Sequence, residues 1–258
     1  MLIGLALLAT GAFASSLGAL VGVGGGIVIV PALTLVFGLP VREAVAVSLV
    51  SILATSLAGS ARYLKRGWID TRLAVTLVLA TTLGAIAGGL LAAVLVERVV
   101  AAVFTVVLLY TATDAVRGSA RAPETEPIVF HGRPVYRVRN LELGLGVSGV
   151  AGVLSGLLGI GGGAIQVPIM AAYMRVPFKI AVATSSMMLG VTAAASAVVY
   201  YGRGDILRDV TGWVCLGALL GAPVGTWLAQ RMPALLVRRT FFVVAVLTAA
   251  RMLFGRVL

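Results

Sequence analysis

Charged side chains are scarce in this sequence. They make up 11% of the 258 residues, against about 25% in an ordinary soluble domain. Hydrophobic residues account for 60%, and the mean hydropathy is +1.10. A soluble domain of this composition would have too few polar side chains to cover its surface, and a disordered chain would be far less apolar. The composition therefore predicts an all-α protein that crosses a membrane several times.

Cysteine, histidine and acidic residues are also few: one Cys, one His and nine Asp and Glu. The single Cys215 excludes a disulfide framework and a Cys-based metal site. No Ser/His/Asp set, metal-ligand cluster or pair of carboxylates lies within an apolar run. We therefore expect no enzyme and no cofactor. No Asp, Glu or His lies in the middle of a predicted span, so the sequence offers no carboxylate for a proton relay.

Basic residues are more numerous, and the net charge is +11. They lie mostly between the apolar runs, as the positive-inside bias of membrane proteins would place them. Since the sequence offers no solvated basic domain that could bind nucleic acid, we expect no nucleic-acid binding. The expected surroundings are the lipid bilayer of the cell's cytoplasmic membrane, with a homo-oligomer as one possible assembly.

The chain matches itself at an offset of 137 residues, without a gap from Gly22 to Ile69. The match includes glycines, prolines and hydroxyl residues at corresponding positions, and it continues weakly to the end of the chain. We therefore predict two transmembrane repeats, 1–121 and 138–258, joined by a cytoplasmic linker at 122–137. Gly and Pro breaks at corresponding places in two membrane repeats are typical of transporters.

Each repeat contains about four apolar runs long enough to span a membrane, and one run that is too short. The expected spans are 2–21, 41–61, 73–96 and 99–116 in the first repeat, and 141–158, 178–201, 210–230 and 235–254 in the second. The short runs, 27–37 and 164–174, are expected to be half-helices. The distribution of basic residues slightly favours an odd number of crossings per repeat, which would make the repeats inverted.

A glycine run precedes each short segment, at Gly24, Gly25 and Gly26 and at Gly161, Gly162 and Gly163. Glycine destabilises a straight helix by about 1 kcal/mol relative to alanine, so we expect breaks there. Unwound backbone survives in a membrane where protein or a water-filled cavity satisfies it. A half-helix that starts after such a break directs free N–H groups and its positive end at a small volume, which suits an anion. Close helix packing by small residues is the alternative explanation.

Several polar residues near these breaks are candidates for lining the anion site. They are Ser48, Ser51 and Thr55 in the first repeat, and Gln166, Ser185 and Thr192 in the second. Structural hydrogen bonding between helices is the alternative for each of them. Arg66 and its repeat equivalent Arg203 could flank an anion path. We expect Tyr63 and Tyr200 to lie at the membrane interface.

The runs GVGGGIVIVP at 22–31 and GIGGGAIQVP at 159–168 resemble the signature of the TauE/SafE family of sulfite exporters. The resemblance extends over both repeats, through REAVAVSL at 42–49, KIAVATSS at 179–186 and the Y-x-x-R-G ends at 63–67 and 200–204. It implies a prokaryotic membrane permease for small sulfur-containing anions, such as sulfite or organosulfonates, usually acting in export.

The leading hypothesis is therefore a secondary permease with a site at the two glycine breaks. A channel-like anion facilitator is a second transport hypothesis, favoured by the lack of a titratable relay. A membrane assembly factor without a substrate is a third, but it would have no need for matching breaks in the middle of the membrane.

Overall fold

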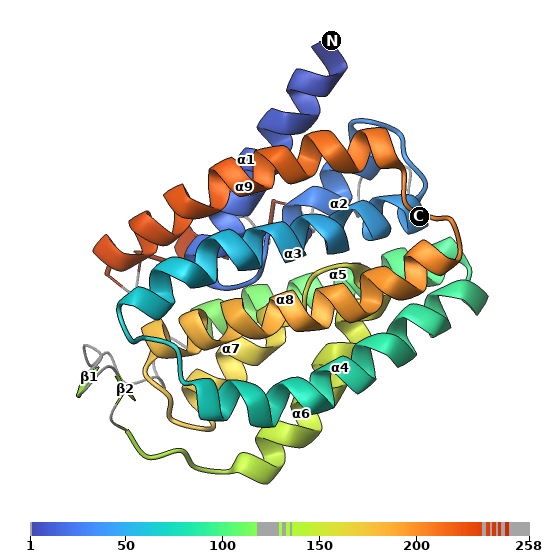
Figure 1. Ribbon diagram of the computed structural model, residues 1–258. Coiled ribbons are helices and arrows are strands. Elements are labelled where there is room, and N and C mark those ends of the chain that lie inside the picture. The colour runs from blue at the N-terminus through green and yellow to red at the C-terminus, as the bar shows by residue number, and fades with distance from the viewer. Residues whose placement is uncertain are drawn as a thin grey trace.

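The computed structural model describes residues 2–117, 129–130, 133–134, 136–233, 236–237, 239–240, 242–243 and 246–247. The described chain is helical apart from a two-residue antiparallel pair of strands, Val129–Phe130 (β1) and Arg133–Pro134 (β2). Figure 1 shows long helices that run roughly side by side. The first half contains α1 (Leu2–Val21), α2 (Gly26–Leu35), α3 (Val41–Lys65), α4 (Thr71–Val94) and α5 (Glu97–Arg117). The second half contains α6 (Leu141–Leu158), α7 (Gly163–Ala172), α8 (Phe178–Gly202) and α9 (Arg208–Arg231).

The helices follow the apolar runs of the sequence. Six of them, α1, α3, α4, α6, α8 and α9, are long and apolar enough to cross a membrane. The two short helices α2 and α7 begin directly after the glycine runs, as predicted. Of the predicted span 235–254, only isolated helical residues up to 247 are described. Most of the predicted linker 122–137, with His131, also lies outside the described residues. The protein is thus a polytopic helical membrane protein.

The chain reverses direction at each glycine run. The Gly22, Val23 and Gly24 N–H groups all donate to the Gly18 carbonyl, which folds the chain back over the end of α1. A methyl group on Gly25 would lie only 2.8 Å from the Ala14 carbonyl oxygen, one turn further back in α1. The α6–α7 segment has the corresponding turn. Each half therefore starts with a hairpin of one long and one short helix.

The long helix of each hairpin packs along a helix of the other half. Helix α1 lies against α9, and α4 lies against α6. Glycines allow both close approaches: the Cα atoms of Gly217, Gly221 and Gly225 face the backbone of α1, and those of Gly84 and Gly88 face the backbone of α6. Closely approaching backbones at small residues are the usual interface of membrane helices. Because the 137-residue offset exchanges α1 with α6 and α4 with α9, the two interfaces are equivalent.

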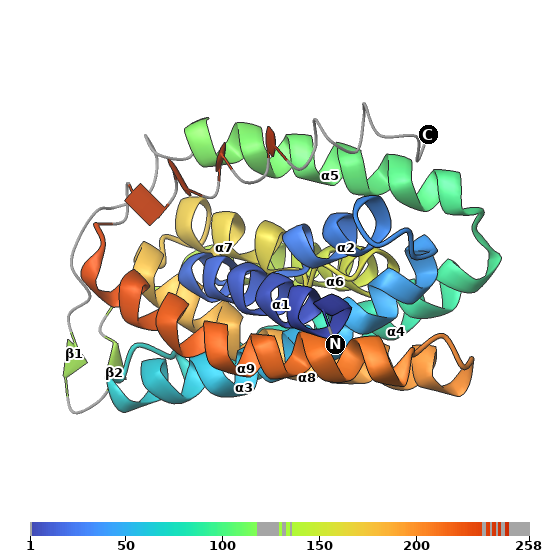
Figure 2. The ribbon, with the colours of Figure 1, turned by 90° about the horizontal axis from the view of Figure 1, so that it is seen from above.

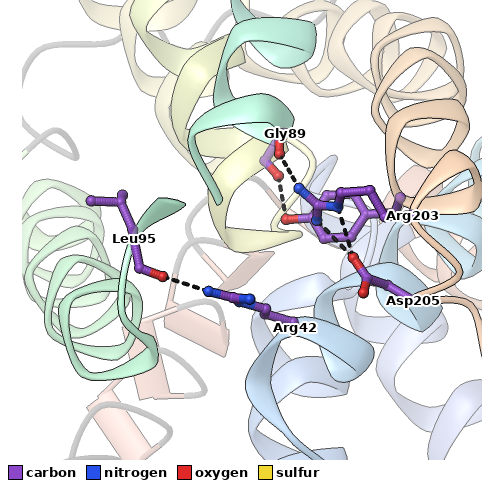
Figure 3. A network of polar contacts seen from close by, with 7 residues as sticks. Arg42, Gly89, Leu95, Arg203 and Asp205 are labelled. Atoms are coloured by element: carbon purple, nitrogen blue, oxygen red, sulfur yellow. Dashed lines mark hydrogen bonds and ion pairs between the residues drawn. The ribbon is translucent and has the colours of Figure 1, made fainter. Parts of the chain in front are cut away.

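Helices α3 and α8 are equivalent under the same offset, and they cross the centre of the molecule in opposite directions (Figure 1). Near the start of α8, the Thr184 hydroxyl accepts a hydrogen bond from the Asp70 N–H, beyond the end of α3, at 3.1 Å. Near the end of α8, Arg203 lies in the same region as Arg42, at the start of α3 (Figure 3). Equivalent helices that run antiparallel support the prediction that the two halves are inverted.

Candidate functional site

The two glycine breaks contain a cluster of left-handed backbone conformations. In the first break the φ angles of Gly22, Gly24 and Gly25 are 80°, 83° and 89°, and in the second those of Gly159, Gly161 and Gly162 are 67°, 80° and 74°. Residues other than glycine rarely adopt these backbone angles. The corresponding angles match at all three positions, so the two breaks share one backbone geometry. All these residues are buried.

Both half-helices begin at the breaks, in the interior of the molecule. In α2 the first helical bond joins the Val28 N–H to the Gly25 carbonyl at 3.0 Å, and in α7 it joins the Ile165 N–H to the Gly162 carbonyl at 3.1 Å. The N–H groups before these have no acceptor within their own helix. Since α2 leads to the start of α3 and α7 to the start of α8, the two half-helices run in opposite directions (Figure 2). A methyl group on Gly26 would collide with the Gly159 carbonyl oxygen, and one on Gly163 with the Gly22 carbonyl oxygen, so the positive ends of the two half-helices lie close together in the interior.

Each break accepts a hydrogen bond from one serine on a helix of the other half. The Ser48 hydroxyl in α3 donates to the Gly159 carbonyl oxygen at 2.7 Å. Its equivalent Ser185 in α8 donates to the Gly22 carbonyl oxygen at 3.0 Å. Both serines are fully buried. A hydroxyl has one proton to donate, so neither serine donates to an anion while it holds its carbonyl.

The other predicted hydroxyls also bond to protein groups. Ser51 donates to the Val47 carbonyl one turn back in α3, and its oxygen lies 3.7 Å from the Cys215 sulfur. Thr55 lies 2.9 Å from the Ser15 hydroxyl oxygen of α1. Thr192 donates to the Met188 carbonyl at 3.0 Å. The structure places these three side chains at the interfaces of α3 and α8 with their neighbouring helices.

Gln166 lies in the first turns of α7, and its side chain is 3% exposed. Its Oε1 atom has no hydrogen-bond partner. The buried Ser155 hydroxyl of α6 also lacks a partner, and its Cβ lies beside Gly162. The equivalent residues in the first half, Ile29 and Gly18, have no polar side chain. The second break therefore carries two buried polar groups that the first lacks. The sequence analysis did not name Ser155, although the 137-residue offset pairs this serine with Gly18 and so shows a polar side chain present in the second repeat alone.

The two arginines proposed to flank a path lie at opposite ends of the molecule, because α3 and α8 are antiparallel. Arg66 is exposed beside Trp68, with its guanidinium carbon 5.6 Å from the ring centroid. Lys179 of α8 lies over the same ring, also at 5.6 Å. Arg203 is partly buried over the ring of Tyr200 at 4.3 Å. The linker end thus has two cations beside the Trp68 ring, and the opposite end has Arg203 beside the Tyr200 ring. The sequence analysis overlooked Arg42 and Lys179, which are equivalent to each other.

The prediction for the two tyrosines was wrong. Tyr63 and Tyr200 are 1% and 0% exposed. Their hydroxyls donate to the carbonyls of Ala19 and Gly156, at 3.1 and 3.0 Å. These carbonyls belong to the last turns of α1 and α6, where the hydroxyl replaces part of the helix bonding that the break removes. The tyrosine hydroxyls therefore bond to the backbone next to the breaks, and the side chains are buried in the protein and not exposed at the membrane interface.

No group of three or more His, Cys, Asp or Glu side chains that could hold a metal ion occurs among the described residues. The buried polar side chains of the described residues are hydroxyls and one amide, that of Gln166, and the described carboxylates lie outside the buried core.

Comparison with known proteins decides the family. The sequence model of the family described as "Sulfite exporter TauE/SafE" matches residues 7–252. The chain belongs to the TauE/SafE family. A probable membrane transporter protein of Bacillus subtilis, YunE, is 24% identical over 96% of this chain and 96% of its own length. A probable membrane transporter protein of Xylella fastidiosa is 28% identical over 89% of this chain and 87% of its own. No solved structure matches the chain.

Membership of the TauE/SafE family, the relatives described as transporters and the six apolar helices together identify a multi-pass membrane transporter. As the glycine signature suggested, the family resemblance seen in the sequence is confirmed. Each of the two breaks that carry this signature is hydrogen-bonded to a helix of the other half.

Proposed function

We propose that this TauE/SafE transporter is a secondary permease that carries a small sulfur-containing oxyanion, sulfite or an organosulfonate, out of the cell. The observation that carries the proposal is the meeting of the positive ends of α2 and α7 at the two breaks. Each helix end stabilises a negative charge by roughly 0.3–2 kcal/mol. Two such ends favour an anion without a mid-span arginine, and the modest affinity allows the anion to leave again.

We place the proposed substrate at the second break more than at the first. The buried Gln166 amide and Ser155 hydroxyl provide polar groups there, and the Ala164 and Gly163 N–H groups begin α7. Ser48 and Ser185 would join the site only if a conformational change released them from their carbonyls. The residues proposed for binding therefore remain those at the breaks, together with Ser51 and Thr55 of α3 and Thr192 of α8.

The proposed orientation follows from the charges at the two ends of the helices. The end that carries the linker holds many basic and few acidic residues, namely Arg62, Lys65, Arg66, Arg72, Arg137, Arg139, Arg175, Lys179 and Arg231 against Asp70 and Glu142. The opposite end is balanced, with Arg42, Arg98, Arg203 and Arg208 against Glu43, Glu97, Asp205 and Asp209. The positive-inside rule assigns the linker end to the cytoplasm.

The decisive experiment measures flux in proteoliposomes. Labelled sulfite, sulfoacetate and taurine are followed with and without a pH gradient, in vesicles with protein and in empty vesicles. We expect anion flux that sulfite or a sulfonate inhibits and a matched amine does not. Equal inhibition by the amine, or no flux of any of these anions, would refute the proposal.

A channel-like facilitator is the second candidate, because the buried polar residues described in the structure are all hydroxyls and one amide. Such a set offers no titratable group for proton coupling. The same vesicles distinguish the two mechanisms. Uphill movement of the anion driven by a pH gradient or by a counter-ion gradient requires a coupled permease, whereas a facilitator only equilibrates the anion.

A further inference from the structure

The end of the molecule opposite the linker carries a compact charged cluster (Figure 3). Arg203, after the end of α8, donates from Nη1 to the Gly89 carbonyl of α4 at 2.8 Å. Its Nε donates to Asp205 at 2.9 Å. Arg42, in the first turn of α3, donates from Nη2 to the Leu95 carbonyl, just beyond α4, at 2.8 Å. Two arginines from different halves therefore hold the same end of α4.

Each arginine keeps a buried nitrogen that donates no hydrogen bond. The Nε atom of Arg42 is buried and unpaired. The Nη2 atom of Arg203 lies 2.8 Å from the Asp205 oxygen already bonded to Nε, but its N–H is not directed at that oxygen. A buried donor without an acceptor is costly, most of all on a charged group. Arg42 Nε is such a donor, and Arg203 Nη2 is held by an ion pair without a hydrogen bond, so both nitrogens could bind a further acceptor.

The charge of the cluster indicates what kind of acceptor it is. Arg42 and Arg203 both lie close enough to the Tyr200 phenol to interact with it electrostatically, so their charges act on one small volume. Asp205 supplies a single negative charge against the two guanidinium groups. The remaining positive charge and the planar, forked donors suit an oxyanion, which guanidinium binds through two parallel N–H bonds.

The other end of the molecule differs in sequence as well as in contacts. The residues equivalent to Arg203 and Asp205 are Arg66 and Trp68. The guanidinium of Arg66 is exposed and forms no hydrogen bond or ion pair with a described residue, while Trp68 is 9% exposed. The ion pair of Arg203 with Asp205 therefore has no equivalent between Arg66 and Trp68 at the linker end.

We propose that Arg42 and Arg203 form a binding site for the substrate's oxyanion group at the end opposite the linker, and that Asp205 and the α4 carbonyls occupy this site when no anion is bound. A sulfonate or sulfite that arrives accepts hydrogen bonds from the two guanidinium groups and displaces Asp205. The arginines then no longer bond to the carbonyls at the end of α4. Binding of the anion thus opens the end at which it binds. This inference rests on the proposed function, because it takes its ligand from there.

The first test is calorimetric binding of methanesulfonate and of sulfate to the purified protein in nanodiscs. Arg42→Gln and Arg203→Gln should each weaken binding about tenfold, the loss expected for one charge-assisted contact. Asp205→Asn should strengthen it several-fold, since the competing carboxylate is gone. Arg208→Gln, which changes an exposed arginine at the same end, is the matched control and should bind as the unchanged protein does. If Arg203→Gln does not fold, Arg203→Lys keeps the charge without the fork and should bind with intermediate affinity.

The second test measures the opening itself and needs no transport. Ser196 is fully buried in α8, two turns before Arg203, and its hydroxyl lies 3.3 Å from the Ala85 carbonyl of α4. Ser196→Cys in a Cys215→Ala background provides a single thiol behind the cluster. A cationic, membrane-impermeant thiol reagent should label it slowly, and faster when methanesulfonate is added or when Asp205 is changed to Asn.

The outcomes of the two tests are separate from those of the flux measurement. Unchanged binding in Arg42→Gln and Arg203→Gln, weaker binding in Asp205→Asn, or labelling that the anion does not accelerate would each overturn the site. Absence of flux with binding and labelling as expected would instead refute the permease and keep the site.

Discussion

Replacement of Ser48 or Ser185 by alanine tests whether these serines act on the backbone or on the substrate. Each hydroxyl is the donor that satisfies a buried carbonyl at a break, Gly159 for Ser48 and Gly22 for Ser185. Loss of such a donor leaves the carbonyl unpaired and costs about 1–3 kcal/mol. In a chain of this size each kcal/mol lowers the melting temperature by roughly 2–4 °C. We therefore expect each variant to melt several degrees lower.

The matched control is Ser51→Ala. Ser51 is as buried as Ser48 and lies on the same helix, but its hydroxyl donates to the carbonyl of Val47 four residues back. That carbonyl keeps its helical hydrogen bond when the hydroxyl is removed, so the control should lose little stability. The two proteins differ by one hydroxyl in the same helix, which removes most effects of composition and of membrane insertion.

The assay is thermal unfolding of the purified variants in one detergent, read alongside flux in proteoliposomes. The double variant Ser48→Ala with Ser185→Ala should lose at least the sum of the single losses, because both bonds hold the same pair of breaks. If both single variants are as stable as Ser51→Ala and yet lose anion transport, the serines act on the substrate and the backbone role is wrong.

Three further predictions concern glycines and one half-buried tyrosine. Gly25→Val and Gly162→Val should abolish flux and lower stability, because the φ angles are 89° and 74° and the new Cβ would lie 2.8 and 3.2 Å from a carbonyl oxygen; normal flux in both would remove the breaks from the mechanism. Gly225→Val should separate α9 from α1 and destabilise the protein, whereas Gly212→Val, which meets no atom within 4 Å, should not; equal melting of the two would contradict the packing. Burial and a 2.6 Å hydrogen bond to a carboxylate raise the pKa of Tyr136 above 10, so its bond contributes stability at all lower pH values and this contribution is lost only above pH 10. The difference in 295 nm absorbance between the unchanged protein and Tyr136→Phe should therefore show no ionisation of this residue at pH 10, and ionisation there would refute the buried bond.

The helices and the breaks could be predicted from the sequence because local signals specify them. Apolar runs predicted the bounds of α1, α3, α4, α6, α8 and α9 to within a few residues, and glycine runs predicted the starts of α2 and α7. The repeat offset also predicted that Ser48 and Ser185 would have equivalent surroundings. Their partners were not predictable, because each bond joins a serine to a carbonyl in the other half, more than 100 residues away.

The misplacement of Tyr63 has a similar cause. Tyrosine near a helix end with arginines is common at the membrane interface, and nothing local to residues 62–66 indicates that the chain turns back at Gly22 and presents a carbonyl. The pairing of α1 with α9 was foreseeable in part. Glycines four residues apart, Gly217, Gly221 and Gly225, indicate a close helix contact, but the sequence does not name the helix that fills it.

The exchange of partners between the halves has a consequence for biosynthesis. Helix α1 is synthesised before α9, yet the surface it packs against belongs to α9. Helix α4 is likewise synthesised before α6, the helix against which it packs. The first half therefore enters the bilayer with surfaces on α1 and α4 that only helices of the second half cover. It remains an unassembled intermediate in the membrane until α9 has been made. Two separately expressed halves should then be degraded when produced alone and become stable when produced together.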